Sequence, residues 1–215
     1  MSARARVMAG VMGLALVAGA RGSIWLESSD AGALPSLDQM TIGVGSLDSI
    51  EGMLSDRSDV DMFRITIADT SLFEAMVTNT TQDTQLYLFT RDGHGVVMND
   101  DDPTGSGSLR SRIDGASVPA LGTYLLAITR YNRDPRDTNG RSLWKDMPYS
   151  TIRQPDGPGK NSAITRWSST TAGVGGAYTI AMTGATFAVT PSPGSLALLG
   201  LGGMVILRRE RGVLA

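Results

Sequence analysis

An alternation of apolar and polar residues with a period of two dominates the central part of the chain. In residues 62–67, the apolar side chains of Phe63, Ile65 and Ile67 alternate with a second set that we expect to face solvent, namely Met62, Arg64 and Thr66. Successive side chains of a β-strand point to opposite faces, so this pattern predicts a strand with one buried face. The same pattern recurs in residues 123–129, through Tyr124, Leu126 and Ile128, and in residues 178–182, through Tyr178, Ile180 and Met182.

Residues 84–90 differ because large side chains occupy both faces, Leu86 and Leu88 on one and Tyr87 and Phe89 on the other. Apolar residues on both faces indicate a strand inside a sheet. The glycine-containing turn at 91–95 and the apolar residues 96–98 then predict a hairpin. Together with short strands expected within 41–54 and 73–78, the pattern predicts an all-β fold, a single antiparallel β-sandwich with a jelly-roll-like arrangement.

Residues 132–176 break this rhythm, with four prolines and many Gly, Ser and Asp residues. Loops of this length are uncommon in compact domains. Because Trp144, Tyr149 and Trp167 lie within it, we expect this long loop to fold back onto the sandwich.

The first twenty residues have the layout of a signal peptide. Arg4 and Arg6 precede an apolar run at 7–17 and a small-residue cleavage site at 18–20. We therefore expect an N-terminal signal helix at 1–20, a lead-in at 21–40, the sandwich at 41–187, and a tail at 188–215. The protein is expected to be exported to the cell envelope or the extracellular space.

The tail combines Pro191 and Pro193, an apolar run at 195–207, and the basic residues Arg208 and Arg209. Thirteen helical residues span only about 20 Å of the roughly 30 Å hydrocarbon core, so the predicted transmembrane helix is short. The segment resembles a PEP-CTERM sorting signal, with Ser192 where that family usually has Glu. This resemblance implies the inner membrane and an exosortase-like enzyme as partners during export. The alternatives are a plain C-terminal anchor that tethers the protein to the membrane and a frayed tail.

The net charge and the lack of cysteine limit which partners and which kind of stabilisation are expected. Residues 21–189 hold fourteen Lys and Arg against twenty Asp and Glu, a net charge of about −6, which disfavours nucleic-acid partners. The chain has no cysteine, so its stability in an oxidising compartment depends on a hydrophobic core.

Five fragments in order resemble the bacterial pre-peptidase C-terminal (PPC) domain and the related DVUA-type envelope proteins. They are DVDMF at 59–63, DTQLYLF at 83–89, NDD at 99–101, GTY at 122–124 and GAYT at 176–179. Ser58, where the family commonly has Gly, and the long loop depart from the family pattern. The resemblance implies a non-catalytic β-sandwich module, structural or adhesive.

No catalytic motif is present, and the only histidine, His94, falls in the predicted hairpin turn. A catalytic role is therefore not expected, although an unrecognised carboxylate site stays open as a third hypothesis. No cofactor is required by the sequence. The candidate binding site is a calcium site, because acids cluster at two strand ends and Ca²⁺ prefers hard oxygen ligands. The alternative is that these acids only cap turns. The predicted calcium ligands are Asp59, Asp61, Asn99, Asp100 and Asp101.

Trp144 and Trp167 suggest a second function, a carbohydrate-binding module in which aromatic side chains of the long loop form a platform for an envelope polysaccharide. Packing in the core is the alternative role for these side chains.

Overall fold

The computed structural model describes residues 23–170 and 173–190. Within these ranges, regular structure consists of β-strands and one 3-10 turn at Gly115–Ser117, as predicted for an all-β chain. A search of the same ranges finds no helix with the length and apolar character needed to cross a membrane. The predicted signal peptide at 1–20 and the sorting residues Pro191, Pro193, Arg208 and Arg209 lie outside the described residues.

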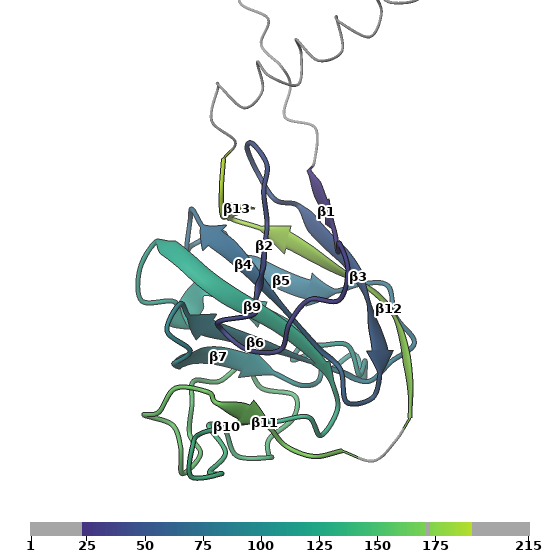
Figure 1. Cartoon of the computed structure of the whole chain (residues 1–215), viewed down its shortest axis with the longest axis vertical. Helices are drawn as coiled ribbons and strands as arrows, with labels where there is room; N and C mark the ends of the chain where they lie inside the picture. Colours follow the sequence, from purple (N-terminus) through teal and green to yellow (C-terminus); the bar gives the residue numbers. More distant parts are fainter. Residues whose placement is uncertain (1–22, 171–172, 191–215) are drawn as a thin grey trace, which may run out of the picture.

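Two sheets pack face to face (Figure 1). The five-stranded sheet contains, in spatial order, β1 (Ile24–Leu26), β3 (Ser49–Asp56), β12 (Val174–Thr183), β5 (Glu74–Val77) and β8 (Arg112–Asp114). The six-stranded sheet contains β13 (Ala185–Phe187), β4 (Val60–Ile67), β9 (Gly122–Arg130), β6 (Thr84–Thr90) and β7 (Gly95–Asn99), with β2 (Gln39–Met40) paired to β4.

The sheets are mixed and not purely antiparallel. β1 runs parallel to β3, and β2 runs parallel to β4. Both strands come from the lead-in, so the segment before residue 41 contributes one strand to each sheet. The remaining pairs are antiparallel, including the β6–β7 hairpin that the turn at 91–95 predicts.

The core between the sheets consists of the alternating side chains identified from the sequence. One buried cluster unites both sheets, and it contains Phe63, Ile65, Leu86, Tyr124, Ile128 and Ile180. The predicted inward direction of these side chains is therefore confirmed, while β9 also buries Leu125 and Ala127 in a separate cluster on its other face. Burying a large apolar side chain of this kind contributes roughly 1.5–3 kcal/mol to stability.

A second core lies on the outer face of the six-stranded sheet. The long loop, which carries β10 (Pro135–Arg136) and β11 (Arg166–Trp167), lies against β6 and β7 at the lower end of Figure 1. Trp144 and Trp167 pack there against Tyr87. The expectation that Met62 faces solvent is wrong, because Met62 points to this face and the loop buries it.

Candidate metal centre

Asp61 is a carboxyl group buried between the two sheets. It precedes Phe63 by two residues on β4, so both side chains point to the same face, and Asp61 is 0% exposed. The Tyr178 hydroxyl donates a hydrogen bond of 2.7 Å to its Oδ2 atom. Its Oδ1 atom has no hydrogen-bond partner among the described residues.

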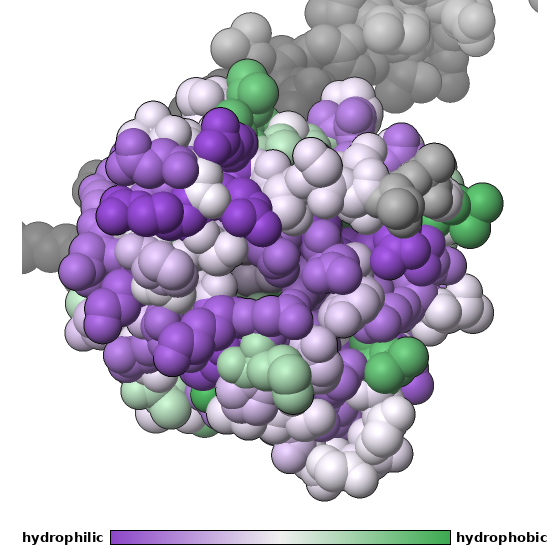
Figure 2. All heavy atoms as spheres, turned by 90° about the horizontal axis from the view of Figure 1, so that it is seen from below, coloured by the Kyte–Doolittle hydropathy of each residue, from purple (hydrophilic) through white to green (hydrophobic). Residues whose placement is uncertain are grey.

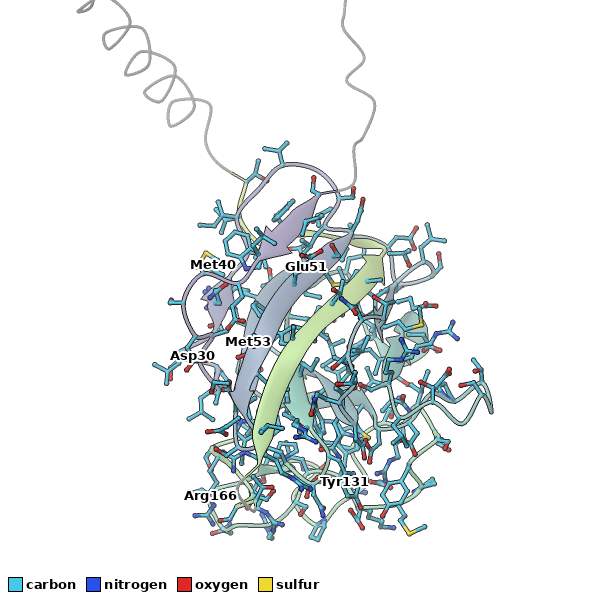
Figure 3. All side chains as sticks on the ribbon, turned by 90° about the vertical axis from the view of Figure 1, so that its right-hand side faces the viewer. Asp30, Met40, Glu51, Met53, Tyr131 and Arg166 are labelled. Carbon is cyan, nitrogen blue, oxygen red and sulfur yellow. The ribbon has the colours of Figure 1, made fainter. Side chains whose placement is uncertain are left out.

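The lead-in brings two further carboxylates to Asp61. Oxygen atoms of Glu27, Asp30 and Asp61 all lie within 4.8 Å of one another, and we name these residues the lead-in cluster. Glu27 is held in place, since its Oε1 accepts from the Ala31 amide and its Oε2 from the Met53 amide, each at 2.9 Å. Figure 3 shows Asp30 beside Met53 of β3, near the edge of the five-stranded sheet.

Electrostatics in the lead-in cluster are unfavourable without a cation. Burial, together with the negative charges of Glu27, Asp59 and Asp30, raises the pKa of Asp61 to about 9, against the opposing effect of the Tyr178 hydrogen bond. Asp59, followed by burial and Asp56, also raises the pKa of Asp30. Oxygen ligands with unbalanced negative charge are the donor set that Ca²⁺ prefers.

Asp59 does not belong to this group of ligand atoms. Its two oxygens accept hydrogen bonds from the amides of Val60 at 2.8 Å and Ser55 at 2.5 Å. Asp59 therefore shapes the turn between β3 and β4 and adds negative charge next to the lead-in cluster.

A second group of acids gathers where β6 begins and β7 ends. Oxygen atoms of Asp83, Asp100 and Asp101 lie within 4.8 Å of one another, and we name these residues the hairpin cluster. Asp100 is 1% exposed, and burial followed by its two acidic neighbours raises its pKa to about 8. Its Oδ2 accepts a 3.4 Å hydrogen bond from Gln85, while Oδ1 has no partner within the described ranges.

Positive charge distinguishes the two clusters. Burial and Asp101 raise the pKa of Asp83, whereas Arg130 and Arg57 lower it. Arginines therefore balance Asp83 in part, whereas the charged residues that act on Asp100 are acids. For Asp30 and Asp61 of the lead-in cluster the charged influences are likewise acids.

The structure separates the ligands predicted from sequence: Asp61 lies in the lead-in cluster, Asp100 and Asp101 lie in the hairpin cluster, and Asp59 and Asn99 lie in neither. Asp61 and Asn99 lie three strands apart in the six-stranded sheet, since Asp61 pairs with Ile128, Ile128 with Leu86, and Leu86 with Asn99. At about 4.8 Å per strand, the two residues are about 14 Å apart. One site cannot contain both residues. The Asn99 side chain has a structural role instead, because it accepts a hydrogen bond from the Arg112 amide at 2.9 Å and donates one to the Tyr149 carbonyl at 3.3 Å.

Trp144 and Trp167 are buried, with 3% and 8% of their surfaces exposed. Their indole Nε1 atoms donate to backbone carbonyls of Arg153 at 3.2 Å and Ala33 at 2.7 Å. A carbohydrate platform needs exposed ring faces. The burial therefore favours the packing alternative over a sugar-binding role for these two residues.

His94 lies in the β6–β7 turn, as the sequence predicts, with its side chain 47% exposed. Its Nδ1 atom is 3.1 Å from Asp92 Oδ2. Thr90 donates to the same Asp92 carboxylate through Oγ1, at 2.5 Å, so His94 forms part of a hydrogen-bonded turn.

Sequence reasoning did not identify Glu27, Asp30 or Asp83 as members of these clusters. One signal was available for Asp61: extending the period-two pattern of β4 backwards from Phe63 places Asp61 on the buried face. Comparisons of the chain with known protein families and with curated proteins gave no significant match.

Proposed function

We propose that this protein is an exported, non-catalytic β-sandwich module of the cell envelope or extracellular matrix, with a structural or adhesive role. Its lead-in cluster binds Ca²⁺. The observation that carries the calcium assignment is the Asp61 carboxyl group, which is fully buried, retains an unpartnered oxygen and lies among other acids. The finer description, a jelly-roll-like sandwich of the PPC type, is part of the proposal.

The position of the lead-in cluster explains how an ion would stabilise the module. Glu27 and Asp30 belong to the segment after β1, which is attached to the five-stranded sheet, whereas Asp61 belongs to β4 of the six-stranded sheet. An ion bound by all three carboxylates would join the lead-in to both sheets. It would also replace the proton that the raised pKa of Asp61 otherwise retains at neutral pH.

Export through the signal peptide and sorting through the PEP-CTERM-like tail complete the proposal. The inner membrane and an exosortase-like enzyme are the partners during export. The support for this part is the layout of residues 1–20 and 188–215 in the sequence.

Calcium titration of the purified protein tests the metal assignment. At a Ca²⁺ concentration 100 times the Kd, binding adds about 2.7 kcal/mol to the free energy of unfolding. For a protein of this size that raises the melting temperature by about 5–10 °C relative to EDTA.

Asp30→Asn should remove this increase without disturbing the fold, because the Asp30 side chain is exposed. Asp101→Asn, in the hairpin cluster, is the matched control and should retain it. The lead-in assignment is wrong if Asp101→Asn abolishes the increase and Asp30→Asn does not. Calcium binding itself is excluded if the unmodified protein melts at the same temperature in Ca²⁺ and in EDTA.

A further inference from the structure

Arginine side chains line a groove beside the long loop, the segment that carries β10 and β11 at the lower end of Figure 1. One pocket is bordered by Arg57 and Arg136, and an adjoining pocket by Arg136 and Arg166. The pockets share Arg136, Ser168 and Ser169, so they form one continuous surface, which we name the arginine groove. The face of the molecule at this end is predominantly hydrophilic (Figure 2), and Figure 3 shows Arg166 near the lower end.

Two of these arginines are held opposite each other. Arg136 on β10 and Arg166 on β11 are directly paired in an antiparallel ladder. Side chains at such positions have Cβ atoms about 4.5–5.5 Å apart, and like charges there destabilise the pair.

Both guanidinium groups also approach Gly140. Arg136 Nη1 donates to the Gly140 carbonyl at 3.0 Å. Arg166 Nη2 lies 2.5 Å from the position that a Cβ atom on Gly140 would occupy. The absence of a side chain at Gly140 thus leaves room for two cationic groups to converge.

Nearby acids do not neutralise this pair. Asp137 is committed to Arg141, which donates to it through the backbone amide and through Nε, each at 2.8 Å. Asp134 borders the groove but forms no ion pair with Arg136 or Arg166. Among residues 23–170 and 173–190, no carboxylate forms an ion pair with Arg57, Arg136 or Arg166, whereas four other arginines are paired.

We infer that the arginine groove binds carboxylate groups of an acidic polysaccharide. A guanidinium group presents parallel N–H donors that match the two oxygens of a planar carboxylate. Successive uronate carboxylates along a polymer would satisfy Arg136 and Arg166, and the hydroxyl groups of Ser169 and Thr170 at the groove are suited to sugar hydroxyls. The inference rests on the adhesive role proposed above and specifies the chemistry of its partner.

Binding to polygalacturonate, a polymer of uronate sugars, tests the inference. Dextran serves as the neutral polymer and polyphosphate as the phosphate-bearing one. The unmodified protein should bind polygalacturonate, more weakly as salt increases, and should not bind dextran. Replacing both residues (Arg136→Gln with Arg166→Gln) should weaken the affinity about tenfold or more, because the variant loses both charged donors to the uronate carboxylates.

Arg91→Gln is the matched control, since Arg91 is an exposed arginine in the β6–β7 turn and does not border the groove. It should retain the affinity within about twofold. If circular dichroism shows that the double variant is unfolded, Arg166→Gln alone is used, because Arg166 is exposed.

Three results would overturn the inference: no binding of polygalacturonate, equal loss in the variant and the control, or tighter binding of polyphosphate than of polygalacturonate. Measuring the melting temperature of the unmodified protein in Ca²⁺ without polymer, beside polymer binding in EDTA, separates the two proposals. Absence of calcium stabilisation with intact polymer binding contradicts only the calcium site, and calcium stabilisation without polymer binding contradicts only the groove.

Discussion

The buried carboxyl group of Asp100 should make the stability of this protein depend on pH. In the folded protein the Asp100 pKa is about 8, whereas an unperturbed aspartate has a pKa of about 3.9. Because the folded state holds the proton more tightly, this group contributes its full stabilisation below about pH 4. That contribution is lost as the pH rises towards 8.

The size of the effect follows from the pKa difference. Between the two pKa values, the folded state holds about one more proton than the unfolded state, which lowers the free energy of unfolding by about 1.4 kcal/mol per pH unit. From pH 5 to pH 7, Asp100 therefore accounts for a loss of about 3 kcal/mol. Asp100→Asn has a similar size but cannot ionise, so its stability relative to the unmodified protein should improve by about that amount over this interval.

Urea denaturation at pH 5, 6 and 7 in the presence of EDTA measures this difference without interference from divalent cations. Asp69→Asn is the control. The Ser71 hydroxyl and amide both donate hydrogen bonds to Asp69 and lower its pKa, so it is ionised throughout and its difference should not change with pH. The reasoning is refuted if the difference in free energy of unfolding between Asp100→Asn and the unmodified protein stays constant with pH. It is also refuted if that difference becomes less favourable to the variant as the pH rises.

Two further predictions concern packing and the Asp61 site. Trp144→Ala should lower the free energy of unfolding by about 3–5 kcal/mol, because the indole packs on Tyr87 and Phe89. The control is Leu121→Ala, at a 63% exposed position, which should lower it by less than about 0.5 kcal/mol. Equal losses in urea denaturation would contradict packing of the long loop. Tyr178→Phe removes the hydroxyl donor to Asp61 and should cost about 1–3 kcal/mol at neutral pH; unchanged stability would show that this hydrogen bond does not support the buried carboxyl group.

Most strands of the sandwich could be predicted because strand formation leaves a local signature. In β4, β9 and β12 one face is buried against the opposite sheet, so apolar residues recur at every second position. β6 carries apolar residues on both faces because the long loop covers its outer side. The tryptophans of that loop predicted its return to the sheet from their size and polarity alone.

The lead-in strands could not be predicted in the same way. β1 has three residues and β2 has two, which is too short for a period to be visible. Their parallel pairing with β3 and β4 depends on how the chain is routed between sheets. The burial of Met62 likewise depends on a loop more than sixty residues away.

Sequence alone determined that the chain forms strands, which side chains fill the space between the sheets, and that acids are available as oxygen ligands. Only the tertiary structure decided which acids meet. Glu27 and Asp61 are more than thirty residues apart and lie on segments attached to different sheets, and Arg136 faces Arg166 across a ladder within the long loop. Periodicity reports the environment of one segment, whereas a binding site depends on the distances between segments, which are set by sheet order and strand register.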